Sequence, residues 1–268
     1  MRLSSRSAAL VAVILIAGYA VAGGLARAGG ETGADAGHAP TQASASEAPH
    51  WDYEHEDKWS ETFADAYACA RGSRQSPLDL KSTPLIDEPD LLTHYKAGLG
   101  RIFNNGHTIE ISVEPGSFMT LDDERFELLQ AHFHHPSEHA IDGERYAMEM
   151  HFVHRKEAGA LAVVGVMLRE GVNNPQIARL WAAIPKRVGK EHQATVDFDP
   201  NAFLPEDRVH FQYDGSLTTP PCTEGVTWLV LRQPIDASPK QVAAFRALEG
   251  RNARSLQARN GRMITEGE

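Results

Sequence analysis

Two short segments dominate the interpretation of this chain, QAHFH at residues 130–134 and EMHFV at residues 149–153. Polar and apolar residues alternate along both segments, which is typical of β-strands. Successive side chains of a strand point to opposite faces, so His132 and His134 share one face of the first strand. His151 lies in the middle of the second strand. If the two strands are neighbours in a sheet, the three imidazoles converge.

These three histidines, called the histidine trio below, form a candidate metal centre. Three imidazole nitrogens about 2.0–2.1 Å from one ion are typical of a catalytic zinc site, which keeps its fourth tetrahedral position for water. Zn²⁺ is therefore the expected cofactor. Gln130 and Glu149 each lie two residues before a histidine of the trio, on the same face, and can accept the other ring N–H. The alternative is a set of half-buried polar residues on a solvated face.

A second interpretation comes from HPSEH at residues 135–139, which matches H-x-x-E-H, the inverted zincin pattern of metallopeptidases. That pattern needs a helix, because both histidines must lie one turn apart on one side. Here the preceding residues alternate as a strand, and Pro136 fits a helix only at its start. We therefore favour the histidine trio.

The rest of the chain is dominated by strand patterns. Alternating or continuously apolar stretches occur at residues 102–103, 109–113, 118–121, 126–133, 146–154, 161–168 and 227–231. The sequence Asn104-Asn105-Gly106 is a turn signal between the first two. The strands do not alternate regularly with helices, which indicates a mixed or mostly antiparallel sheet.

Two helices are predicted. One starts at Asn174-Pro175, a cap followed by a first-turn proline, and extends to Ile184. The other starts at Ser238-Pro239 and ends at Gly250. In the second helix we expect three residues to face inward: Val242, Phe245 and Leu248.

The composition limits the class of protein. Of 268 residues, 42% are hydrophobic, enough for a sizeable core in one large domain or two small ones. With 26 basic and 36 acidic residues, the net charge of −10 argues against binding nucleic acid or anionic lipid through bulk charge.

The N-terminus has the features of an export signal. Arg2 and Arg6 precede an apolar run at residues 8–22, and Ala26-Arg27-Ala28 is a plausible cleavage site. We expect a signal peptide at residues 1–28, a flexible linker at 29–50 and one folded domain at 51–268. The alternative is an uncleaved anchor, but the run is short for a span of ~20 residues. The expected location is the periplasm or the exterior, with no stable membrane span after cleavage.

Export changes the interpretation of the two cysteines, Cys69 and Cys222. Outside the cytosol two cysteines usually pair, which makes a disulfide the expected state. Free thiols or metal ligands are the alternatives. A bridge would close a loop of 222 − 69 = 153 residues and stabilise the fold by roughly 4–5 kcal/mol in the chain-entropy model.

Taken together, the motifs resemble the α-class carbonic anhydrases. The matching segments are RQSP at 74–77, NNGH at 104–107, QAHFH at 130–134, SEH at 137–139, EMHFVH at 149–154, SLTTPPC at 216–222, VTW at 226–228, and Asn252 with Arg254. They follow the family's order from about Trp51 to about Met263, essentially the whole body of the chain. Their joint occurrence is highly specific.

The resemblance implies a mainly β (α+β) fold, a single domain around a large, mostly antiparallel twisted sheet with short peripheral helices. It implies zinc-dependent, reversible hydration of carbon dioxide to bicarbonate and a proton, with Zn²⁺ on the histidine trio. Gln130, Glu149 and the backbone carbonyl of Asn252 would orient the ligands. The cysteine pair would match the one in exported members.

It also implies roles around the metal. Thr218 would orient the attacking hydroxide and donate its own proton to Glu138, while His107 would be the proton shuttle. An imidazole suits this task because its pKa near 6.5 lets it take up and release a proton at neutral pH. The pocket for CO₂ would be lined by Val153, Val163, Leu217, Thr219 and Trp228.

Several alternatives remain at this point. The same site would support a zinc esterase, and a catalytically idle zinc-binding module is a further hypothesis. Thr218 with Glu138 is also explained by an ordinary buried hydrogen bond, and His107 by simple exposure beside a glycine turn. His135 stands where many animal members have Trp, and Ala253 and Ser255 differ from animal forms, which weakens the role given to Asn252. The oligomeric state is not predicted.

Overall fold

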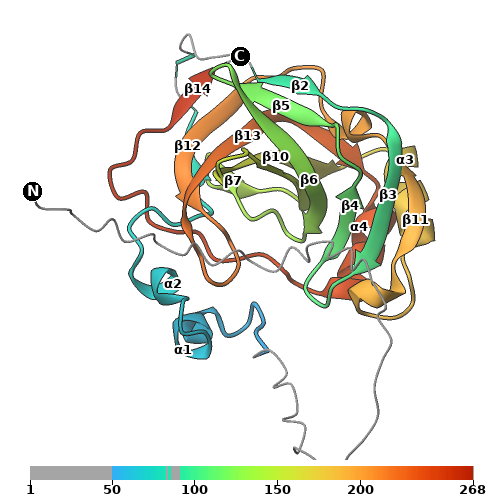
Figure 1. The fold of residues 1–268 in the computed structure, drawn as a ribbon, viewed down its shortest axis with the longest axis horizontal. Helices are drawn as coiled ribbons and strands as arrows, with labels where there is room; N and C mark the ends of the chain where they lie inside the picture. The colour runs from blue at the N-terminus through green and yellow to red at the C-terminus, as the bar shows by residue number, and fades with distance from the viewer. Residues whose placement is uncertain (1–49, 83, 86–90, 268) are drawn as a thin grey trace, which may run out of the picture. The chain divides into compact units, whose positions relative to one another are not determined.

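One large twisted sheet contains most of the strands that the structure describes (Figure 1). The structure, a computed structural model, describes residues 50–82, 84–85 and 91–267. Within these residues the strand order is β11-β3-β4-β6-β9-β10-β13-β12-β14, and β5 pairs with β6 and β2. The bounds are β2 Leu92–His94, β3 Gly98–Asn104, β4 Ile109–Val113, β5 Phe118–Leu121, β6 Glu124–His134, β9 Met148–Arg155, β10 Leu161–Glu170, β11 Ala194–Phe198, β12 His210–Ser216, β13 Glu224–Ala237 and β14 Thr265–Gly267.

The helices and a second, small sheet lie around this framework. The small sheet has the order β1-β7-β8, with bounds Asp79–Leu80, Ala140–Ile141 and Glu144–Arg145. The α-helices are α1 Trp59–Thr62, α2 Tyr67–Arg71, α3 Pro175–Ala183 and α4 Pro239–Glu249. The 3₁₀ turns are η1 Glu56–Lys58, η2 Lys190–His192 and η3 Pro200–Phe203.

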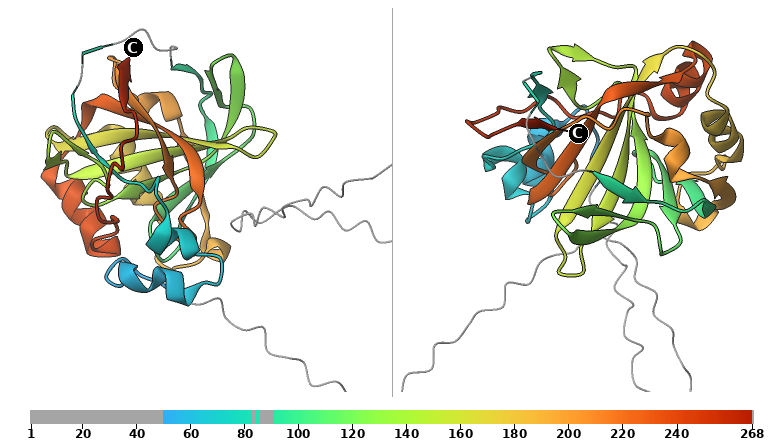
Figure 2. Two further views of the ribbon diagram at one scale, coloured as in Figure 1. Left: turned by 90° about the vertical axis from the view of Figure 1, so that its left-hand side faces the viewer. Right: turned by 90° about the horizontal axis from the view of Figure 1, so that it is seen from above.

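Strand directions confirm the predicted fold class. In the large sheet the described pairs are antiparallel except β10 with β13, which run parallel. The sheet is therefore mixed and mostly antiparallel, and Figure 2 shows its twist from two further directions. None of the described helices is long and apolar enough to cross a membrane.

The sheet buries apolar side chains on both faces. On one face Met150 and Phe152 of β9 and Val164 of β10 pack in a cluster that includes Leu180 of α3 and Phe245 of α4. The opposite face has a smaller apolar cluster, in which β10, β12 and β13 meet the short strand β1. The site lies on the face of this second cluster.

Both predicted helices are present, with one correction. Asn174 caps α3 by accepting from two backbone N–H groups, and Ser238 forms a capping box with Gln241 at α4. Gly250 ends α4 with φ +66°, a conformation that favours glycine. The prediction that Leu248 faces inward is wrong, because this side chain is 54% exposed in the last turn of α4.

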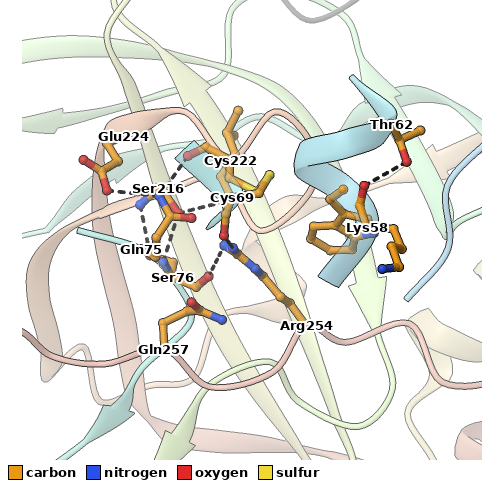
Figure 3. Close-up of a disulfide and its surroundings, with 12 residues drawn as sticks. Lys58, Thr62, Cys69, Gln75, Ser76, Ser216, Cys222, Glu224, Arg254 and Gln257 are labelled. Carbon is orange, nitrogen blue, oxygen red and sulfur yellow. Dashed lines mark hydrogen bonds between the residues drawn. A yellow bond between two sulfur atoms is a disulfide. The ribbon is translucent and has the colours of Figure 1, made fainter. Parts of the chain in front are cut away.

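A disulfide joins Cys69 of α2 to Cys222 in the loop before β13, as predicted (Figure 3). Around it, Arg254 donates to the carbonyls of Ser76 (2.8 Å) and Cys69 (3.4 Å), and Gln75 Nε2 donates to the Cys222 carbonyl (3.1 Å). These contacts fasten the loop between β12 and β13 to the segment before β1. The predicted signal peptide and all but residue 50 of the predicted linker lie outside the described residues.

Candidate metal centre and active site

Strands β6 and β9 bring the histidine trio together on one face of the sheet. They pair antiparallel with His132 opposite His151, and His134 follows two residues along β6. One ring nitrogen from each histidine lies within 4.8 Å of the others. The ring centroids are 4.5–5.1 Å apart. The convergence inferred from strand alternation is therefore present in the structure.

The second ring nitrogen of each imidazole is engaged by a hydrogen bond. His132 Nδ1 lies 2.8 Å from Gln130 Oε1, His134 Nδ1 lies 2.7 Å from the Asn252 carbonyl, and His151 Nε2 lies 2.9 Å from Glu149 Oε1. Each nitrogen that faces an oxygen acceptor must carry the ring proton. The unprotonated nitrogen is therefore Nε2 in His132 and His134 and Nδ1 in His151. These are the three partners expected for the trio.

The electrostatics of the trio fit a metal cation. Burial, followed by repulsion from the neighbouring histidines, holds the pKa of His132 well below its ordinary value. Burial also lowers the pKa of His134. Both rings are thus neutral, with a lone pair available. His134 Nε2 is buried with no hydrogen-bond partner among the described residues, a costly state unless something binds it. Three imidazole donors fit Zn²⁺.

Glu149 accepts hydrogen bonds from His139 as well as from His151, its predicted partner. Its Oε1 accepts from His151 and from His139 Nδ1 (2.8 Å), and its Oε2 accepts from the His139 backbone N–H (2.8 Å). Burial alone would raise the pKa of Glu149, but the two histidines bring it well below its ordinary value. His139 Nε2 contacts the Tyr213 hydroxyl (2.7 Å). The sequence interpretation gave His139 a role only in the inverted zincin alternative and gave none to Tyr213, because neither residue lies on a strand whose alternation could be recognised.

The inverted zincin interpretation is wrong. Residues 135–139 form bends and no helix. His135 Nδ1 lies 2.8 Å from the Ala147 carbonyl, and both ring nitrogens of His139 already have partners. A second group of possible ligands, His139 with Glu149 and His151, is for the same reason less suited to a metal than the trio.

Glu138 is fully buried beside the trio. Its Oε1 accepts from the backbone N–H of Arg254 (2.9 Å), and its Oε2 has no hydrogen-bond partner among the described residues. Thr218 is buried in the loop between β12 and β13. The predicted hydrogen bond from Thr218 is not made at Oε2, which leaves a buried acceptor in need of a donor.

An apolar wall adjoins the trio on the same face. Val163 of β10 pairs with Val153 of β9 on one side and with Trp228 of β13 on the other. The Trp228 ring lies 4.8 Å from the His151 ring. Leu217 packs against the same cluster. Thr219, the fifth predicted pocket residue, is half-buried in the loop that follows.

His107 lies on the turn between β3 and β4, at residues 104–108. The His107 ring stacks on the Trp51 ring, with centroids 3.9 Å apart. It also stacks on the His50 ring, with centroids 6.1 Å apart. Burial and the charge of His50 lower the pKa of His107. The side chain of Asn252 donates to the His107 carbonyl (3.0 Å) and to the Phe133 carbonyl (2.9 Å). Asn252 therefore links this turn to β6, the strand that carries His132 and His134.

Comparison with known proteins agrees with this geometry. Residues 54–267 match the family model described as eukaryotic-type carbonic anhydrase. The chain is 40% identical to a carbonic anhydrase of Pectobacterium carotovorum, over 83% of this chain and 93% of the relative. It is 42% identical to one from a Nostoc strain, over 78% and 81%. The α-carbonic anhydrase of Thermovibrio ammonificans, solved with sulfanilamide, superposes with a TM-score of 0.77 at 35% identity, over 81% and 99%. The chain belongs to the eukaryotic-type, or α-class, carbonic anhydrase family.

Proposed function

We propose that this chain catalyses the reversible hydration of carbon dioxide to bicarbonate and a proton at a Zn²⁺ site formed by the histidine trio. The observation that supports this most directly is the convergence of three imidazoles, each with its other ring nitrogen in a hydrogen bond, beside an apolar wall. Family membership supports the same reaction.

The trio would hold the metal, and Gln130, Glu149 and the Asn252 carbonyl would keep the three rings in their ligating tautomers. In carbonic anhydrases bound Zn²⁺ lowers the pKa of its water to about 7, a known property of the family, and so supplies a nucleophile at neutral pH. Glu149 is fully buried, and its two hydrogen bonds from His139 hold its carboxylate toward His151.

Thr218 and Glu138 would orient the nucleophile. A Thr hydroxyl that donates to the open Oε2 of Glu138 has only lone pairs left to face the reaction centre. It can then only accept from the nucleophile, whose own lone pair is left for the substrate. The backbone N–H of Arg254 holds the other carboxylate oxygen in place.

The substrate would lie against the apolar wall of Val153, Val163, Leu217 and Trp228, with Thr219 at its edge. Carbon dioxide is small and uncharged, so an apolar surface suits it better than a charged cleft. His107, half-exposed at the turn, would move the product proton to solvent. Its lowered pKa favours release of the proton once it has been taken up.

The proposed setting is outside the cytosol. The N-terminal signal pattern supports export to the periplasm or the exterior. The disulfide supports it too, because such bonds persist in oxidising compartments.

The test is stopped-flow CO₂ hydration with the purified protein before chelation, after chelation and after addition of Zn²⁺. The expected result is hydration that is lost on chelation and restored by zinc. A protein that binds zinc but shows no chelator-sensitive hydration would be the idle module instead. Ester hydrolysis measured in the same samples should follow the same metal dependence, as a side activity of one site.

A further inference from the structure

The turn that places His107 is held by two asparagine side chains. Asn105 Oδ1 accepts from the backbone N–H groups of His107 and Thr108, both at 2.9 Å. Asn104 Oδ1 accepts from the N–H of Gly106 at 2.7 Å. Residues 104–108 are called the shuttle turn below. Its shape depends on both amide oxygens facing inward.

Each asparagine donates its amide nitrogen to a carboxylate on another element. Asn105 Nδ2 donates to Glu110 Oε2 of β4 at 3.2 Å. Asn104 Nδ2 donates to Glu249 Oε1, on the last residue of α4, at 2.5 Å. The Asn104 amide is held at both ends, because its oxygen accepts from the Gly106 N–H while its nitrogen donates to Glu249. Above its pKa, Glu249 only accepts hydrogen bonds and so fixes which end of the amide faces the shuttle turn, because the reversed amide would set oxygen against oxygen.

Fold stability does not explain Glu249 at this place. A negative charge is unfavourable at the C-terminus of a helix. Burial also raises the pKa of Glu249 to about 7, so the ionised form is disfavoured there. The apolar neighbour Leu248 is 54% exposed, whereas Glu249 is half-buried against Asn104. The contact with the shuttle turn is the feature that distinguishes this carboxylate.

We propose that Glu249 is a positioning residue for proton transfer, which acts through Asn104 to hold the shuttle turn in the shape that presents His107. The inference rests on the proposed function, because it takes His107 as the shuttle. Glu249 contacts the turn from a helix that contributes no residue to the histidine trio or the apolar wall.

The experiment separates proton transfer from substrate conversion. In weak buffer, proton release limits kcat, whereas kcat/KM for CO₂ reports the steps through bicarbonate formation. We expect Glu249→Ala to lower kcat in weak buffer about threefold to tenfold, a part of the ~10²–10⁴-fold contributed by a positioned proton-transfer group. Its kcat/KM should change little, and added imidazole should restore kcat. Glu249→Gln retains an acceptor oxygen and should be less affected than Glu249→Ala.

Control variants distinguish the possible failures. Glu206→Ala removes an exposed glutamate far along the chain from the turn and should match the wild type. If Glu249 acts through Asn104, the double variant with Asn104→Ala should be no slower than the slower single variant. Equal loss of kcat and kcat/KM, or a loss that imidazole does not restore, would overturn the inference.

The two proposals fail in different ways. If His107→Ala is slow in weak buffer and rescued by imidazole while Glu249→Ala equals the control, the positioning role is wrong and the proposed function stands. If the zinc-loaded wild type shows no CO₂ hydration, the proposed function is wrong, and the inference falls with it.

Discussion

Glu149 shows how much one buried carboxylate organises at the scale of a residue. It accepts three hydrogen bonds, from His151, from the His139 ring and from the His139 backbone. The carboxylate has room because residue 165, which pairs with His151 across β9 and β10, is a glycine. A Cβ at Gly165 would lie 2.8 Å from Glu149 Oε1. The histidine orientation therefore depends on the absence of a side chain on the neighbouring strand.

Replacing this glycine should weaken the metal site. In Gly165→Ala the new methyl group displaces the Glu149 carboxylate, and loss of such a supporting hydrogen bond typically costs about 10–100-fold in metal affinity. Zinc affinity measured by chelator competition should fall by that factor. Gly98→Ala is the matched control, because nothing lies within 4 Å of its Cβ position on β3. Equal affinities in the two variants would contradict the argument.

Glu249 gives a pH prediction at the same scale. Its folded pKa of about 7 lies above the ordinary value of 4.5, so the folded state holds a proton that the unfolded state releases. The associated stability is present below pH 4.5 and is lost as the pH rises through 7. Glu249→Gln cannot ionise, so it should not lose this stability. The unfolding free energy of Glu249→Gln minus that of the wild type should therefore be larger at pH 8 than at pH 5. Urea denaturation at both values checks this, and a constant difference would disagree.

At the scale of an element, an irregularity in strand β6 decides which face its histidines occupy. Its pairing with β9 shifts between Leu128 and Gln130, which leaves Leu129 as the extra residue of a bulge. Before the bulge the even-numbered Phe126 and Leu128 face the core, and after it the odd-numbered Ala131 and Phe133 do. The bulge thus turns the even-numbered histidines of β6 away from that core.

Deletion of Leu129 should remove the bulge and keep both faces of β6, because it leaves Leu128 and Gln130 adjacent, as their partners on β9 already are. His132 and His134 then stay on the face opposite Phe133. We expect the deletion variant to retain bound zinc, as Leu129→Ala should, in a metal assay of both purified proteins. Loss of zinc from the deletion variant alone would contradict this account of the bulge.

The disulfide acts at the scale of the whole molecule, because it joins two segments separated by 153 positions. Cys222 ends the loop that contains Thr218, and Arg254 links the partner cysteine to the segment that holds Glu138. The disulfide and these hydrogen bonds thereby join segments between Cys69 and Arg254 around the site.

Removing the disulfide should lower the stability of the folded state. The double variant Cys69→Ser with Cys222→Ser should lose roughly 4–5 kcal/mol of unfolding free energy, by the entropy of the opened loop. Denaturation curves with and without reductant provide the control. Reductant should destabilise the wild type and leave the double variant unchanged.

Local sequence patterns were sufficient for much of this structure. Alternation placed the histidines of β6 and β9 on strands, and cap residues located α3 and α4 to within about one residue. Short strands such as β1, β7 and β14, of two or three residues, escaped prediction because so few positions show no period. Leu248 was misplaced because the inward stripe was extended into the last helical turn, where the chain already departs from the core.

By itself the sequence determined the strand character around the histidines, the helix limits, the cysteine pair and the family, because each depends on residue type and local spacing. Only the tertiary structure decided which groups meet: the bulge that turns the trio to one face, His139 with Tyr213 behind Glu149, and Glu249 against the shuttle turn. These contacts join residues far apart along the chain or across a change of register. Their geometry is set by strand pairing and packing, which no local pattern encodes.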